Sequence, residues 1–324
     1  MRASYAVGLD VGGTRIAAGL VERKDRIVRE TKRPTPQGGP FGVVDAIIET
    51  IGEVTAGVHP SEITGIGLGL PAQIDFHRQT VEFCTNLPLG GVDMRGLIMS
   101  RVKHPVTIDN DGHTAALGES RFGAAKGVRD FVMVTVGTGV GGGVFVGGSP
   151  FRGHRGLGGE IGHMVVDLDG PPCPCGGTGH LESFVGRPAI VRDARELAAT
   201  FRGASLARAV GGDPEDITAE SVVEAANAGD EAAAEIMGRI GFVLGKALVG
   251  IVNLMNPQLV LVGGGIGESC PLLLERASQV IAEEALAGRR DVKVVAAQLG
   301  NDAGVVGAGV LAFDEHDSRE GLQR

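Results

Sequence analysis

Glycine clusters at the ends of apolar runs are the feature that most constrains the fold of this chain. Three clusters each follow a short strand-like run: Asp10–Arg15 (DVGGTR), Gly137–Gly143 (GTGVGGG) and Gly263–Ser269 (GGGIGES). Glycine contributes 54 of 324 residues, more than twice the usual ~7%, and no Gly-x-y period accompanies it. Because glycine lacks a Cβ, its backbone N–H groups can close on phosphate oxygens. Three such turns predict a nucleotide site.

Apolar runs alternate with helix-like segments along the chain, which predicts an α/β fold with a largely parallel or mixed sheet. We expect strands over Tyr5–Leu9, Ile16–Val21, Ile63–Leu70, Val106–Ile108, Phe131–Val136 and Gln258–Val262. We expect helices over Phe41–Ala56, Thr114–Glu119, Ser221–Leu254 with a break at Gly229, and Gly304–Phe313. The order strand, glycine turn, strand occurs twice, either as a weak internal duplication or as chance recurrence in a glycine-rich chain.

Two common nucleotide-binding motifs are excluded by their context. Gly137, Gly139 and Gly142 match G-x-G-x-x-G, but a dinucleotide fold requires a helix after this motif. Here the next residues, GVFVGG, alternate like a strand. The sequence G-x-x-x-x-G-K-[ST] of a P-loop is also missing.

Charge and cysteine content exclude several classes of partner. The net charge is −9, from 30 Lys and Arg against 39 Asp and Glu, and such a field repels a phosphate backbone or an anionic membrane. We therefore expect no nucleic-acid and no membrane partner.

Targeting and disulfide signals are also missing from the sequence. The apolar run before Asp10 is too short for a signal peptide, and four cysteines are too few for a disulfide scaffold. The expected location is the cytoplasm.

Two aspartates at strand ends are candidates for chemistry. Asp10, beside the first glycine turn, could orient hydrated Mg²⁺ next to phosphates or could cap the turn. Asp111 follows a short strand and precedes the helix expected from Thr114. A carboxylate at a helix N-terminus stays ionised and can accept a proton from a hydroxyl. Helix capping by Asp111 or Asn110 is compatible with that role.

Five motifs together resemble the ROK family of repressors, open reading frames and kinases. They are DVGGTR, NDGHTAALGE, VTVGTGVGGG, RGLGGEIGH and CPCGGTGHLE, and they follow the family's order over nearly the whole chain. Within the family, the chain is most similar to bacterial ATP-dependent glucokinases. The resemblance implies an actin-like ATPase (ribonuclease H-like) fold with two lobes around a central cleft. We expect a small lobe at 1–118 plus 305–324 and a large lobe at 119–304.

The resemblance also implies an activity and the residues that carry it. The activity is transfer of the ATP γ-phosphoryl group to the C6 hydroxyl of glucose, with Asp111 as general base. The residues implied to bind the sugar are Asn86, Asn110, Asp111, Glu160, His163 and Glu182. The residues implied to bind ATP and Mg²⁺ are Asp10, Gly12, Gly13, Thr14, Arg15, Gly137, Thr138, Gly139, Gly263, Gly264 and Gly265. The family suggests a homodimer or homotetramer.

Alternatives to this activity are open at the level of sequence. The acceptor could be an N-acetylhexosamine, an amino sugar or a cyclitol, and polyphosphate could replace ATP as donor. A third alternative is a sugar-responsive transcriptional repressor, but the helix-turn-helix expected before the first glycine turn of a repressor has no room ahead of Asp10. That leaves a sugar-responsive regulator without its DNA-binding domain as the minor alternative. His113 departs from the small residues and Asn that are usual after the base. We expect it to be packed or at the solvent edge rather than catalytic.

The family's usual zinc site has one His and three Cys, and here His180 stands where the third Cys would be. The resemblance therefore implies a structural Zn²⁺ bound by His163, Cys173, Cys175 and His180, because imidazole can replace thiolate in a tetrahedral site. Such a site would clamp the loop that carries Glu160 and Glu182. The alternative is a degenerate site without metal. A disulfide between Cys173 and Cys175 would be strained at this spacing.

Overall fold

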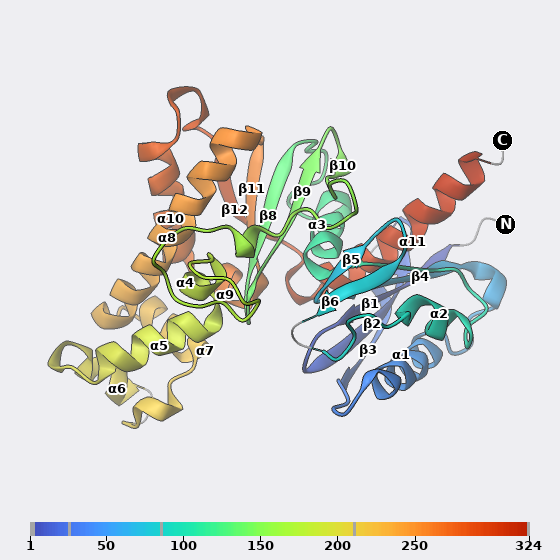
Figure 1. Cartoon of the computed structure of the whole chain (residues 1–324), viewed down its shortest axis with the longest axis horizontal. Coiled ribbons are helices and arrows are strands. Elements are labelled where there is room, and N and C mark those ends of the chain that lie inside the picture. Colours follow the sequence, from blue (N-terminus) through green and yellow to red (C-terminus); the bar gives the residue numbers. More distant parts are fainter. Residues whose placement is uncertain (1–3, 25–26, 85–86, 210–211, 323–324) are drawn as a thin grey trace. The chain divides into compact units, whose positions relative to one another are not determined.

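The fold divides into two compact units. The computed structural model describes residues 4–24, 27–84, 87–209 and 212–322 (Figure 1). The first unit comprises Met1–Gly127, Gly143–Gly159 and Asn301–Arg324, and the second comprises Val128–Gly142 and Glu160–Gly300. The C-terminal segment thus returns to the unit that contains the start of the chain.

The first unit is built on a five-stranded mixed sheet of order β3-β2-β1-β4-β7. β1, β4 and β7 are parallel, whereas β2 runs antiparallel to β1 and β3. The bounds are β1 (Tyr5–Val11), β2 (Arg15–Glu22), β3 (Ile27–Pro34), β4 (Ile63–Leu70) and β7 (Val106–Asn110). Asp10 pairs with Gly69, which pairs with Asp109, so both aspartates lie in one row at the carboxyl edge of the sheet. A two-stranded hairpin, β5 (Ala72–Asp75) and β6 (Thr80–Cys84), follows β4.

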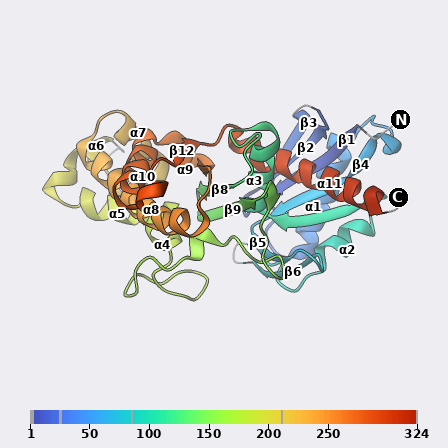
Figure 2. The ribbon, with the colours of Figure 1, turned by 90° about the horizontal axis from the view of Figure 1, so that it is seen from above.

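Helices cover both faces of this sheet, as the two views show (Figures 1 and 2). α1 (Pro40–Val54) packs on the face where Val7 and Leu9 are buried, and α2 (Met94–Met99) adds to the same core. α11 (Ala303–Leu322) packs against β1, β4 and α3 (Asp111–Phe122). A Cβ built on Gly8 or Gly67 would overlap backbone atoms of α11. These glycines therefore let the helix approach the strands at backbone contact distance.

The second unit contains most of the other five-stranded sheet, of order β10-β9-β8-β11-β12. β8, β11 and β12 are parallel, and β10 pairs antiparallel with β9. The strands are β8 (Phe131–Val136), β9 (Val140–Val146), β10 (Ser149–Pro150), β11 (Leu259–Gly263) and β12 (Lys293–Ala296). The helices are α4 (Glu182–Val185), α5 (Arg187–Ala198), α6 (Ala204–Ala209), α7 (Ala219–Asn227), α8 (Glu231–Met255), α9 (Gly264–Ser269) and α10 (Pro271–Glu284). The chain passes from the second unit to the first within β9.

The expected mixed α/β architecture is confirmed, and β4 and β8 have the predicted bounds. The third glycine cluster differs from the prediction: it is not an open turn, because α9 begins at Gly264 directly after β11. The helix predicted over Thr114–Glu119 is longer at both ends, and α5 and α10 were not predicted. The Glu268 carboxylate accepts a hydrogen bond from the Gly264 N–H (3.1 Å) and so satisfies the first turn of this helix. In the part of the chain that the structure describes, no helix has the length and apolar character needed to span a bilayer.

Candidate active site and metal centre

The first glycine turn is a closed loop between β1 and β2. The Gly12 N–H donates to the Arg15 carbonyl (2.8 Å), and the Thr35 hydroxyl donates to the Gly12 carbonyl (2.6 Å). Asp10 lies just before the turn, and a Cβ at Gly304 would be 2.9 Å from its carboxyl carbon. Burial raises the pKa of Asp10, and the charge of Arg15 offsets part of that rise. A carboxylate this poorly hydrated is suited to a cation partner.

The predicted base lies at the junction of β7 and α3. Asp111 is the first residue of α3 and is half-buried. Capping falls to Asn110, whose side-chain oxygen accepts from the N–H groups of Gly112 (2.8 Å) and His113 (3.3 Å). The Asn110 amide also donates to the Ala72 carbonyl (3.2 Å). Asp111 stands at the positive end of α3, and its Oδ1 accepts a hydrogen bond from the Gly112 N–H (2.8 Å).

The second glycine loop, residues 137–140, is held by the segment that contains α4. The Arg187 N–H donates to the Gly137 carbonyl (3.0 Å), and the Val140 N–H donates to Oε2 of Glu182 (3.0 Å). A Cβ on Gly139 would overlap that carboxylate. β9 rather than a helix follows the loop, so the exclusion of a dinucleotide motif is confirmed.

The third glycine segment, at the end of β11, leads directly into α9. Gly264 has φ +81°, a conformation that favours glycine. The Ser269 hydroxyl donates to the Gly265 carbonyl (2.6 Å), which ties the end of this short helix to its start. Gly263 is buried, Gly264 is half-buried and Gly265 is exposed. The second unit thus contains two of the three predicted nucleotide segments.

Four predicted metal ligands lie together within the second unit. The ligand atoms of His163, Cys173, Cys175 and His180 are all within 4.8 Å of one another. The Cys173 Sγ is 3.8 Å from Nδ1 of His163, and the Cys175 Sγ is 3.2 Å from Nδ1 of His180. A tetrahedral Zn²⁺ with bonds of 2.0–2.3 Å separates its ligands by about 3.3–3.8 Å. The donor set and its spacing therefore fit Zn²⁺, and the cysteines are free thiols.

Two predicted sugar ligands flank this cluster. Glu160 precedes a 3-10 helix (Ile161–His163), and its Oε2 is 3.9 Å from Nε2 of His163. His163 thus presents Nδ1 to the metal ligands and Nε2 to a carboxylate. Glu182, at the start of α4, has Oε1 3.9 Å from the Cys173 Sγ. Both carboxylates are half-buried, which leaves them able to accept hydrogen bonds from a ligand.

The predicted site residues are thus divided between the units. Asn110, Asp111 and the first glycine turn lie in the first, and Glu160, His163, Glu182 and the metal ligands lie in the second. Asn86 lies outside the described residues.

A buried ion cluster beside the base was not predicted from sequence. The fully buried Asp109, two residues before Asp111, accepts two hydrogen bonds from Arg152 and contacts His113. His113 was expected to be either packed or at the solvent edge. It is packed, with 3% of its surface exposed. A charged residue at the end of an apolar strand was the available signal, but nothing in the sequence identifies its partner.

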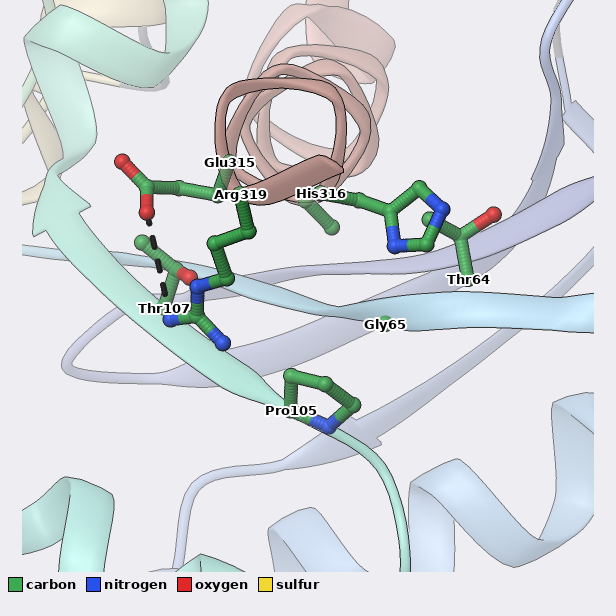
Figure 3. Close-up of a pocket in the computed structure, with 8 residues that line it drawn as sticks. Thr64, Gly65, Pro105, Thr107, Glu315, His316 and Arg319 are labelled. Carbon is green, nitrogen blue, oxygen red and sulfur yellow. Dashed lines mark ion pairs between the residues drawn. The ribbon is translucent and has the colours of Figure 1, made fainter. Parts of the chain in front are cut away.

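A small cavity between α11 and the sheet of the first unit is a different feature (Figure 3). It encloses about 20 Å³ and is lined by residues that include Thr64, Pro105 and His316. Glu315 and Arg319 form an ion pair at its rim (3.9 Å). This volume is close to that of one water molecule and far below that of a sugar or nucleotide. The cavity is therefore not a candidate substrate site.

Comparison with known proteins identifies the family. The model of the ROK family matches residues 6–315. The chain belongs to the ROK family. This ROK protein is 36% identical over 310 residues to a glucokinase of Streptomyces coelicolor, covering 94% of this chain and 96% of that one. It is 35% identical over 305 residues to a glucokinase of Thermotoga maritima, covering 93% and 95%.

A solved ROK structure has the same fold. The crystal structure of a ROK family glucokinase from Streptomyces griseus, in complex with glucose and AMPPNP, superposes with a TM-score of 0.87 at 34% identity. The match covers 96% of this chain and 99% of that chain. The expected actin-like ATPase fold is therefore confirmed for this ROK protein.

Proposed function

We propose that this ROK protein is a glucokinase, which transfers the γ-phosphoryl group of ATP to the C6 hydroxyl of glucose. The observation that carries the proposal is the similarity to glucokinases over nearly the whole length of both chains. Phosphoryl transfer requires positioning and charge stabilisation more than covalent chemistry by the protein. A strand-end carboxylate, glycine loops and a group of hydroxyl acceptors are the parts that such a reaction needs.

Asp111 is proposed to accept the proton of the C6 hydroxyl as that oxygen attacks the γ-phosphorus. The P–O bond to the leaving ADP breaks as the new P–O bond forms, and the proton moves to a carboxylate oxygen. Two features support Asp111 in this role: its position at the N-terminus of α3, and the hydrogen bond that its Oδ1 accepts from the Gly112 N–H (2.8 Å), which fixes the carboxylate at the β7–α3 junction.

Three glycine segments are proposed to hold the nucleotide. These segments are Gly12–Arg15 after Asp10, Gly137–Gly139, and Gly263–Gly265. Because glycine lacks a Cβ, the backbone of these segments can approach phosphate oxygens closely. The N–H groups of Gly12, Gly137 and Gly264 already have partners within the protein, so other N–H groups of the segments are proposed to bind phosphate. Asp10 would hold hydrated Mg²⁺, which neutralises phosphate charge when bound. The two lobes proposed around this site are residues 1–118 plus 305–324, and residues 119–304.

Five side chains are proposed to bind the hexose through its hydroxyls, namely Asn86, Asn110, Glu160, His163 and Glu182. A site built from fixed hydrogen-bonding groups rejects analogues that lack a hydroxyl, because its buried groups then have no partner. The half-buried carboxylates of Glu160 and Glu182 suit this task, since each can accept two hydroxyl protons.

The cluster of His163, Cys173, Cys175 and His180 is proposed to hold one structural Zn²⁺. Four protein ligands leave no open position, so the ion would supply no catalytic water. Its proposed contribution is mechanical: it would fix the segment from Glu160 to Glu182, which contains two of the sugar ligands.

The test of this function is ADP formation with a panel of acceptors and two donors. We expect glucose with ATP to give the highest kcat/KM among glucose, mannose, N-acetylglucosamine, N-acetylmannosamine, glucosamine and inositol. A higher value for another acceptor, or for polyphosphate as donor, would reassign the substrate while keeping the kinase. The cytoplasm, where ATP is available, is the proposed location, and a homodimer or homotetramer is the proposed assembly.

A further inference from the structure

Asp109 anchors a cluster of charged side chains within the first unit. None of its surface is exposed, and it lies two positions ahead of Asp111, the first residue of α3. Oδ2 accepts from Nε (2.9 Å) and Nη2 (2.7 Å) of Arg152. Oδ1 accepts from the Asn110 N–H (2.9 Å) and lies 3.1 Å from Nδ1 of His113. Both oxygens of this buried carboxylate are therefore satisfied.

The ion pair with Arg152 is strong and directional. Two N–H groups of one guanidinium on one carboxylate fix both distance and orientation. The Arg152 guanidinium also lies over the Phe76 ring, 4.0 Å from its centre, so the ring covers one face of the guanidinium. Burial is the largest influence on the pKa of Asp109 and raises it, but the hydrogen bonds and charges of His113 and Arg152 lower the pKa below its ordinary value.

Arg152 belongs to a loop, residues 151–159, that we call the arginine loop. The Gly158 N–H donates to the Arg152 carbonyl (2.8 Å), so the loop closes on the residue that pairs with Asp109. Arg155 adds an ion pair with the buried Asp75 (3.2 Å). The loop is therefore anchored at two arginines to β7 and to the β5–β6 hairpin.

The last residue of the arginine loop rests on His113. Gly159 has φ +95°, and a Cβ there would lie 2.7 Å from Nε2 of His113. Only glycine is compatible with both the backbone conformation and the imidazole beneath it. Gly159 is bonded to Glu160, a proposed sugar ligand. The imidazole and the guanidinium thus fix the two ends of the segment that leads into that ligand.

We infer that Asp109, His113 and Arg152 are positioning residues that hold the arginine loop in place, constrain the backbone directly before Glu160, and so determine hexose affinity and selectivity. The inference rests on the proposed function, because it takes Glu160 as a sugar ligand. None of the three residues needs to touch the sugar, since each acts through the arginine loop. Small displacements of a ligand group are costly because hydroxyl recognition depends on short, directional hydrogen bonds.

The test compares Arg152→Met and Arg152→Lys with a control, Arg121→Met, which removes an exposed ion pair with Asp314 (2.7 Å) on α11. Glucose binding is measured by calorimetry without nucleotide, and kinetics are measured with glucose and mannose. We expect Arg152→Met to raise the glucose Kd about tenfold to a hundredfold and to change the glucose-to-mannose ratio of kcat/KM. The KM for ATP should change less than about twofold, Arg152→Lys should restore part of the affinity, and the control should match wild type.

Arg152→Met leaves a buried carboxylate without its cation, so the double variant Asp109→Asn/Arg152→Met keeps the test informative if the single variant does not fold. Folded variants that bind glucose as wild type does, with an unchanged selectivity ratio, would overturn the inference. Equal weakening of glucose and ATP would overturn it as well, because that result indicates a general structural role. Wild-type protein that phosphorylates no hexose would instead overturn the proposed function on which the inference rests.

Discussion

The Glu182 carboxylate accepts a hydrogen bond from the backbone N–H of Val140 at 3.0 Å. One residue thus joins two functional segments of the second unit, because its other oxygen lies 3.9 Å from the sulfur of Cys173. Gly139 lacks the Cβ that would collide with this carboxylate. The second glycine loop and the predicted metal centre are therefore mechanically connected.

Substitutions of Glu182 can separate its support of the second glycine loop from its proposed binding of glucose. Glu182→Gln retains an oxygen that can accept from Val140, whereas Glu182→Ala leaves that N–H without its partner, at a cost of about 1–3 kcal/mol. We expect Glu182→Ala to raise the KM for ATP roughly tenfold and Glu182→Gln to leave it near wild type. Both variants should weaken glucose binding. Steady-state kinetics with each substrate varied measures the split, and equal ATP KM values for the two variants would contradict it.

The metal centre can be tested by composition and stability. We expect about one zinc per chain by elemental analysis of untagged protein, and Cys175→Ala should lose it with a fall of more than about 3 kcal/mol in the free energy of unfolding. Cys84→Ser is the matched control, since its thiol lies outside the cluster and donates to the Pro71 carbonyl, as a hydroxyl can. Metal-free wild-type protein with unchanged stability in chelator would refute the site.

The role of Asp111 predicts a loss of rate rather than of binding. Asp111→Asn should lower kcat about 10²- to 10⁴-fold, the usual contribution of a general base. The glucose Kd, measured by calorimetry, should change only a few-fold. Asp45→Asn, an exposed carboxylate paired with Arg101, should have wild-type kinetics. An Asp111→Asn variant with near-normal turnover would remove the assignment.

The burial of Asp10 predicts that its carboxylate lowers the free energy of unfolding while it supports activity. Burial raises its pKa above the ordinary 3.8, so at neutral pH the ionised carboxylate favours the unfolded state. Asp10→Asn should therefore raise the free energy of unfolding at pH 7 while lowering kcat. The gain should shrink as pH falls through the folded pKa and vanish below about pH 4, where both states are protonated. Urea unfolding across this range measures it, and a destabilised variant at pH 7 would contradict the argument.

Local signals made part of this molecule predictable. β4 and β8 are short apolar runs bounded by polar or turn residues, so their limits are evident from sequence. The four metal ligands are close in sequence, and the structure brings them within 4.8 Å of one another. The helix after Asn110 also follows from local rules, since a short polar side chain caps it.

Long-range contacts were not predictable. Arg152 and Asp109 are 43 residues apart, and their pairing depends on how the arginine loop returns to β7. The third glycine cluster has the composition of a turn, yet it begins a helix because Glu268 caps its first N–H group. Both features depend on tertiary context that overrides local composition. The helices α5 and α10 were also missed, although each has apolar residues at helical spacing and a proline in its first turn.

The most direct test of the proposed function is identification of the phosphorylated product by ³¹P and ¹³C NMR. Wild-type protein is incubated with MgATP and either glucose or 6-deoxyglucose, which differs only in the hydroxyl that is proposed to attack. We predict a phosphate monoester on C6 of glucose, formed together with one ADP per sugar, and no phosphorylated 6-deoxyglucose. A phosphate on any other carbon, or equal turnover of both sugars, would contradict the account.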